Sequence, residues 1–212
     1  MQKALILLLL LLSGTALCDE EPAILIFGDS LSAGYGMEMD QSWASLLQQR
    51  LESLGYEHRV VNASITGETT EGGAERIADA MQRFAPELLI VELGGNDGLR
   101  GFPPDRMREN LEKIVTAGKK GGAAVILLGI RIPLNYGPRY SKAFEAVFAQ
   151  VAASQNIAWI EFFMEGVALN DELMQADGIH PTAEAQRVLL DNAWPIIREA
   201  LATPGGDQPL AD

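Results

Sequence analysis

The sequence predicts an α/β fold, a three-layer α/β/α sandwich built around a five-stranded parallel sheet. Apolar runs of strand length recur five times along the chain, and a helical pattern follows each of them. The runs are nearly continuous rather than alternating, which is typical of strands that helices cover on both faces. A strand followed by a helix, repeated five times, therefore indicates a parallel sheet between two layers of helices.

The strands are expected where these apolar runs lie, at residues 23–27, 60–61, 88–93, 123–130 and 157–160. Right-handed crossovers limit how such strands can be joined. A short sheet of this kind is expected to take the flavodoxin-like strand order 2-1-3-4-5, in which ligands bind beyond the carboxyl ends of the strands.

The helices are expected between and after these strands, where apolar residues recur at helical spacing. Their expected ranges are 43–54, 73–84, 104–119, 140–154 and 182–201, and Pro181 is expected to start the last helix.

Residues able to carry chemistry gather at the carboxyl edge of this predicted sheet. Ser30 follows the first strand, Ser64–Gly67 the second and Gly94–Asp97 the third, whereas Asp177 and His180 lie on the loop before the last helix. Because the carboxyl ends of parallel strands meet at one edge, four separate segments converge there. The fold thus predicts a functional site at this edge.

The first 18 residues are typical of an export signal. Lys3 precedes an unbroken apolar run from Ala4 to Leu12, and small residues follow. The run is too short to span a bilayer as a helix. Cleavage after Cys18 would release one domain at 19–203 with a loose polar tail at 204–212. A retained N-terminal anchor and acylation at Cys18 remain as alternatives, the latter disfavoured by the size of Leu17.

Length and composition indicate an acidic, single-domain protein. Cys18 is the only cysteine, so the cleaved chain would depend on a packed core rather than on disulfides. The formal net charge of −13 argues against nucleic acid and against anionic membranes as standing partners. We therefore expect no nucleic-acid partner and no stable membrane insertion, with a monomer as the default state.

A nucleophile and its base are predicted at opposite ends of the chain. Ser30 stands in the run Gly-Asp-Ser-Leu, where the end of a strand would expose its hydroxyl. Asp177 lies three residues before His180, so one turn can bring the carboxylate to one imidazole nitrogen while the other faces the serine. Taken alone, the first run is also an ordinary turn or helix cap, and the second could be a surface loop.

Two further residues could stabilise an oxyanion. The Asn96 side-chain amide follows two glycines at the end of the third strand, and Gly67 could turn its backbone N–H into the site. The alternative for both is turn chemistry. Asp97 is expected to brace its loop rather than to react.

The chain resembles the SGNH, or GDSL, hydrolase family, whose four sequence blocks occur here in the family's order. The blocks are Gly28–Leu31, Asn62–Thr69, Gly94–Asp97 and Asp177–Pro181. The resemblance implies a hydrolase domain at 19–203 with Ser30 as nucleophile and Asp177 and His180 as its partners. It also implies oxyanion donors from the N–H groups of Ser30 and Gly67 and from the Asn96 amide.

Within the family, the chain looks most like the secreted bacterial lysophospholipase L1, acyl-CoA thioesterase I and arylesterase group, through residues 92–101 and 135–140. That likeness implies esters or thioesters of acyl chains, lysophospholipids included, as substrates and a mobile loop over an acyl groove at Gly98–Phe102. Residues that could line the groove, or equally belong to the core, are Leu99, Phe102, Leu134, Tyr136, Met164 and Ile179.

Other functional classes fit the sequence less well. It has no G-x-S-x-G run, phosphate loop or dinucleotide turn. Its two histidines, His180 and a His58 expected to be exposed, are too few for a metallohydrolase. No cofactor or metal is therefore expected. A carbohydrate O-acetylesterase of the same family and a binding module with a dead site remain as alternatives.

Overall fold

The computed structural model describes residues 21–202, apart from the side chain of Leu134. The predicted export signal at 1–18 and the predicted tail at 204–212 lie outside the described residues, so both remain predictions.

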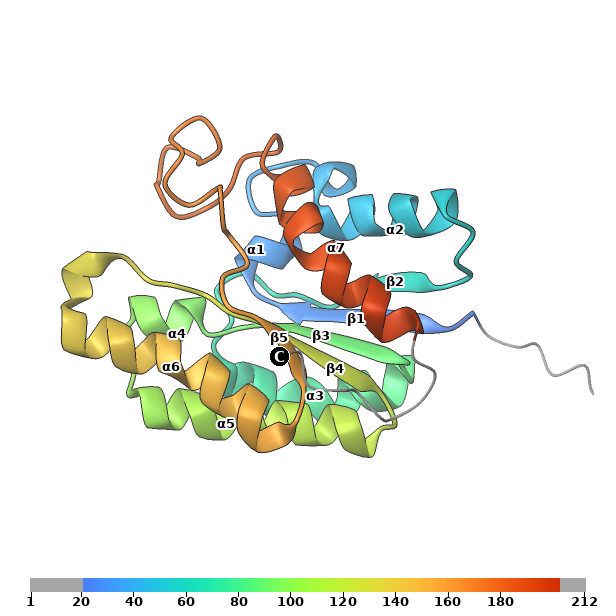
Figure 1. The fold of residues 1–212 in the computed structure, drawn as a ribbon, viewed down its shortest axis with the longest axis horizontal. Helices are drawn as coiled ribbons and strands as arrows, with labels where there is room; N and C mark the ends of the chain where they lie inside the picture. Colours follow the sequence, from blue (N-terminus) through green and yellow to red (C-terminus); the bar gives the residue numbers. More distant parts are fainter. Residues whose placement is uncertain (1–20, 203–212) are drawn as a thin grey trace, which may run out of the picture.

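The described chain forms one parallel sheet of five strands in the order β2-β1-β3-β4-β5, as the sequence predicted (Figure 1). The inner strand β1 pairs on both sides, so that Ile26 lies opposite Asn62 in β2 and Ile90 in β3. The strands are β1 Ala23–Gly28, β2 Arg59–Asn62, β3 Leu88–Glu92, β4 Ala124–Leu128 and β5 Ala158–Ile160.

Helices cover both faces of the sheet (Figure 1). One core cluster packs α3, α5 and α6 against one face, and a second packs α2 and α7 against the other. The α-helices are α1 Ser30–Ala33, α2 Trp43–Ser53, α3 Thr70–Phe84, α4 Gly95–Leu99, α5 Pro104–Lys120, α6 Pro138–Gln155 and α7 Gln186–Ala202, and the short 3-10 helices are η1 Met39–Gln41 and η2 Leu134–Tyr136.

The two-sided cover explains the continuous apolar runs. In β1, Leu25 and Phe27 belong to the cluster under α3, α5 and α6, whereas Ile24 and Ile26 belong to the cluster under α2 and α7. All four side chains are fully buried. Successive side chains of a strand point to opposite faces, and here each face needs an apolar residue.

The ends of several elements differ from the expected ranges. The helix expected from residue 73 starts at Thr70, because the Thr69 side chain caps it by accepting a hydrogen bond from the Gly72 N–H. Pro181 does not start the last helix, which was a wrong prediction. It forms an isolated antiparallel bridge with Met174, and α7 begins only at Gln186.

The two short helices α1 and α4 were not expected from periodicity. Each follows an inner strand directly, α1 after β1 and α4 after β3, and each is only a turn or so long. Segments this short contain no full apolar period, so their sequence shows only turn residues. They carry the residues of the candidate site.

Candidate active site

Ser30 is the first residue of α1, at the point where the chain leaves the inner strand β1. Asp29 caps this helix, because its Oδ1 accepts a hydrogen bond from the Leu31 N–H at 3.1 Å. Gly34 then ends the helix in a left-handed conformation, with φ of +76°. The tight turn holds the serine at the carboxyl edge of the sheet.

The structure brings Ser30, His180 and Asp177 together in one hydrogen-bonded chain. The Ser30 Oγ lies 2.9 Å from His180 Nε2, although 150 residues separate the two along the sequence. On its other side, His180 Nδ1 lies 2.7 Å from Asp177 Oδ2. These distances are within reach for proton transfer from a hydroxyl to an oriented imidazole.

Asp177 is held as a carboxylate by several hydrogen bonds. Its Oδ1 accepts the N–H groups of His180, at 3.0 Å, and of Ile179, at 2.9 Å, in addition to the bond from the imidazole. The backbone bond from His180, with these others, lowers the pKa of Asp177 to about 2. Asp177 therefore stays negative at neutral pH and can stabilise an imidazolium.

Three N–H groups could serve an oxyanion, one on each loop that follows β1, β2 and β3. The Asn96 Nδ2 donates one hydrogen to Asp29 Oδ2 at 3.0 Å. Gly67 has φ of +80°, and its carbonyl accepts a hydrogen bond from the Arg100 guanidinium at 3.0 Å. Among residues 21–202, no acceptor takes the backbone N–H of Ser30 or of Gly67. Both N–H groups are available for a ligand.

Buried acids lie directly beneath this arrangement. Burial raises the pKa of Asp29 to about 6, and it raises that of Glu92 well above the usual range, with the nearby Asp29 adding to the shift. Glu92 Oε2 accepts the Ser32 hydroxyl at 2.7 Å, and the Trp43 indole N–H in turn donates to that hydroxyl at 3.2 Å. This network supports the turn that carries the serine.

Asp97 lies in the bracing position that the sequence predicted for it. It is buried, and it accepts hydrogen bonds from the Thr70 N–H at 2.8 Å and from the Thr70 hydroxyl at 2.6 Å. These bonds tie α4 to the start of α3. Burial raises the pKa of Asp97.

The residues expected to line an acyl groove fall into separate places. Leu99, Phe102 and Tyr136 are half-buried neighbours, since the Tyr136 hydroxyl donates to the Leu99 carbonyl at 2.8 Å and that of Tyr140 to the Phe102 carbonyl at 2.7 Å. Ile179 is 41% exposed beside the imidazole.

Met164 differs from these residues because it is buried. It is only 6% exposed and packs in the core cluster under α2 and α7, where little surface is left for a ligand to contact. The side chain of Leu134 lies outside the described part of the structure.

Sequence reasoning missed three residues around the site: Glu92, Tyr35 and Gln175. Glu92 did carry a signal, because it is the one charged residue in the buried strand Leu88–Glu92. The Tyr35 ring lies against His180, with 4.3 Å between the ring centroids, and Gln175 binds the backbone near both. No local pattern marks an aromatic or an amide that acts through a distant loop.

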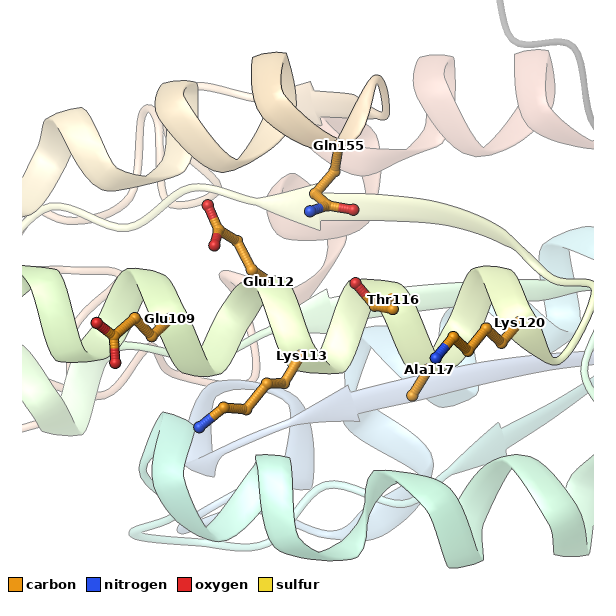
Figure 2. Close-up of a pocket in the computed structure, with 7 residues that line it drawn as sticks. All are labelled: Glu109, Glu112, Lys113, Thr116, Ala117, Lys120 and Gln155. Carbon is orange, nitrogen blue, oxygen red and sulfur yellow. The ribbon is translucent and has the colours of Figure 1, made fainter.

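An open depression elsewhere on the surface contains none of the proposed catalytic residues. It lies over α5 and reaches the end of α6, on the outer side of the helix layer (Figure 2). Its lining is mostly polar and consists of Glu109, Glu112, Lys113, Thr116, Ala117, Lys120 and Gln155. None of these side chains belongs to the hydrogen-bonded chain around Ser30, so this depression is not the predicted site.

No metal site stands out within residues 21–202, where no group of three His, Cys, Asp or Glu side chains is placed to hold an ion. His58 was expected to be exposed, but its side chain is only 15% exposed and lies 3.5 Å from Glu87. Both residues flank the starts of strands, far from the carboxyl edge.

Within residues 21–202, none of the helices is long and apolar enough to cross a membrane.

The chain is similar in sequence and in fold to known esterases and thioesterases. The chain is 48% identical over 178 residues to esterase TesA of Pseudomonas aeruginosa, covering 84% of this chain and 89% of that protein. It is 43% identical over 168 residues to thioesterase 1/protease 1/lysophospholipase L1 of Escherichia coli, covering 79% of each. A crystal structure of TesA superposes with a TM-score of 0.82 at 47% identity, covering 84% of this chain and 99% of that one.

Residues 26–188 match the GDSL-like Lipase/Acylhydrolase family, and this span includes every residue of the hydrogen-bonded chain from Ser30 to Asp177. The chain therefore belongs to the GDSL-like lipase/acylhydrolase family of hydrolases, as its four sequence blocks predicted.

Proposed function

We propose that this protein is an exported serine esterase that hydrolyses carboxylic esters and thioesters of acyl chains through an acyl-serine intermediate. The observation that carries the proposal is the chain of hydrogen bonds from the Ser30 hydroxyl through His180 to Asp177, at 2.9 and 2.7 Å. A hydroxyl, a base and an orienting carboxylate in this order are the parts of a serine hydrolase.

Acylation starts at the Ser30 hydroxyl. His180 Nε2 takes the hydroxyl proton as the oxygen attacks the substrate carbonyl, and the Asp177 carboxylate stabilises the resulting imidazolium. The carbonyl oxygen becomes an oxyanion, which the N–H groups of Ser30, Gly67 and Asn96 are available to bind. The imidazolium then gives its proton to the leaving alcohol or thiol as the bond to it breaks.

Deacylation repeats these roles with water. His180 removes a proton from a water molecule that attacks the acyl-serine carbonyl, and the same donors bind the second oxyanion. The proton then returns to the Ser30 oxygen as the carboxylic acid leaves. The serine is thereby restored, and no cofactor enters either half of the reaction.

The names of the relatives support acyl esters, thioesters and lysophospholipids as the substrate classes. Leu99, Phe102 and Tyr136 lie together at the same sheet edge, and Ile179 is exposed beside the base, so we assign the acyl contacts to these four. The export signal that the sequence predicts at residues 1–18 supports export to the periplasm or beyond.

Hydrolysis of p-nitrophenyl esters, from acetyl to palmitoyl, tests the proposal. The protein from Asp19 onward should cleave them, and Ser30→Ala should abolish turnover while leaving the melting curve unchanged, because only the hydroxyl is lost. Wild-type-like turnover in that variant would remove Ser30 from its role. A preference for acetyl alone would favour a carbohydrate O-acetylesterase, and no activity at any length would favour a dead-site binding module.

A further inference from the structure

The loop that carries both Asp177 and His180 stands out from the sheet edge. Residues 176–179 are exposed, and the Asp177 side chain is itself 37% exposed. A hydrogen bond in such a position is weakened by competing water. Contacts other than Asp177 can therefore add to the support of the imidazole.

One such contact is made by Tyr35 on the loop after α1. Its ring lies against the imidazole, with centroids 4.3 Å apart and planes inclined by 36°. This contact covers a face of the imidazole and leaves its two nitrogen edges to Asp177 and Ser30. A ring in this place opposes a tilt of the imidazole toward it, a motion that hydrogen bonds at the two nitrogens oppose only weakly.

Gln175 joins the loop of the base to the loop of Tyr35. Its backbone N–H donates to the His180 carbonyl at 2.7 Å, and its side-chain Nε2 donates to the Tyr35 and Pro181 carbonyls, both at 2.9 Å. The Tyr35 N–H donates in turn to the Ser30 carbonyl at 3.4 Å. The backbones of nucleophile and base are therefore linked through two residues.

The backbone around Gln175 is shaped for this contact. Gly36 has φ of +74°, and a Cβ at that position would lie only 2.5 Å from Gln175 Oε1. Glycine is therefore the residue that lets the amide approach the loop of Tyr35. The bridge between Met174 and Pro181 closes the loop of the base at its root.

We propose that Tyr35 and Gln175 are positioning residues that hold the His180 imidazole in line with Ser30, as a second support beside Asp177. The inference rests on the proposed esterase function and adds to it two residues that act through the base rather than on the substrate. Tyr35 restrains the ring and Gln175 restrains the backbone that presents it.

The test is steady-state hydrolysis by the full-chain protein and its Tyr35→Ala and Gln175→Met variants, with active sites counted by a serine-reactive phosphonate ester. Each variant should lose about 3- to 10-fold in kcat per titrated site, the size expected for one aromatic pair or one or two hydrogen bonds. KM should stay within about twofold, because ground-state binding is untouched. Tyr35→Phe keeps the ring and should restore kcat.

Two matched variants control for general damage to these loops. Met39→Ala removes an exposed apolar side chain from the Tyr35 loop, and Glu172→Ala removes an exposed side chain before Gln175. Both should turn over like the wild type. Gln175→Met keeps the side-chain length and leaves the Tyr35 ring in place, so it tests the support even if Tyr35→Ala folds poorly.

The outcomes separate this inference from the proposed function. Unchanged kcat per titrated site in Tyr35→Ala and Gln175→Met would overturn the positioning role, and so would a rise in KM at constant kcat, which would make Tyr35 a substrate contact. If Ser30→Ala were as active as the wild type, the proposed function itself would fail, whatever the Tyr35 variants did.

Discussion

The Asn96 side-chain amide donates a hydrogen bond to the carboxylate of Asp29, at 3.0 Å, and so connects the loop after β3 to the residue directly before Ser30. Asp29 is only 2% exposed, and its other oxygen accepts the Leu31 N–H. One N–H of the amide is therefore fixed, which orients the second. The same contact holds the proposed nucleophile and the proposed oxyanion donor in one unit.

Removing the amide should show whether it binds the oxyanion. Asn96→Ala is expected to lower kcat by about 10² to 10³, the usual cost of one oxyanion donor, with little change in KM. Ester hydrolysis under steady-state conditions measures both constants. A loss confined to KM would instead make Asn96 a substrate-binding residue.

Removing the Asp29 carboxylate, which anchors the Asn96 amide, should lower kcat less than removing the amide itself. Asp29→Ala is expected to lower kcat by about 10-fold and to destabilise the fold by about 1 kcal/mol, because the cap of α1 is lost. Asp29→Asn retains an oxygen that can accept the Asn96 N–H and should fall between this variant and the wild type. Asp105→Ala, an exposed acid in the first turn of α5, is the control. Equal kcat in all four proteins would contradict the anchoring role.

The buried Glu92 should make folding stability fall as pH rises. Burial raises its folded pKa above the usual 4.5, so the folded state binds the proton more tightly than the unfolded state. The resulting stability is complete below pH 4.5 and is lost as pH rises toward the folded pKa. Glu92→Gln cannot ionise and should lose less stability than the wild type between about pH 5 and pH 8. Urea unfolding across that range measures this, and parallel curves would show that Glu92 is ionised in the folded protein.

Asp177, in contrast to Glu92, should make folding stability fall as pH is lowered into the acid range. Its folded pKa, about 2, lies below the usual 3.8, so its stabilisation is present above pH 3.8 and is lost as pH falls through about 2. Water screens the half-exposed side chain, and the effect should therefore be small, below about 1 kcal/mol. Thermal unfolding of Asp177→Asn should show a shallower acid decline than the wild type. The matched control is Asp171→Asn, which removes the charge of an exposed acid outside the hydrogen-bonded chain.

Gly28 should tolerate no side chain. A Cβ there would lie 2.8 Å from Glu92 Oε2 and 2.9 Å from both the Glu92 carbonyl and the Ser32 hydroxyl. Gly28→Ala is expected to cost about 1 to 3 kcal/mol and to lower kcat, because relief of the clash moves the turn that carries Ser30. Gly122→Ala meets only open space and should keep its kcat, losing about 1 kcal/mol for a φ of +85°. Melting curves and turnover of both variants measure the difference, and a fully active Gly28→Ala would show that the turn adapts.

The sequence by itself determined the strand order and the edge where the site would lie. Apolar runs such as Leu88–Val91 are continuous because helices cover both faces of their strands, and that property is visible without any long-range information. The spacing between Asp177 and His180 is also local, since one turn makes the contact. The positions of Ser30 and Asn96 follow from the strands that precede them.

Tertiary packing alone decided which distant side chains meet. Met164 entered the core while Ile179 stayed exposed, although both are apolar residues in loops before α7. The place of Pro181 depended on its bridge to Met174. The contact of Tyr35 with His180 depended on two loops that lie far apart in the sequence and meet only in the folded protein. Periodicity reports only the local environment of a residue, whereas such contacts arise between segments that the folded sheet brings to one edge.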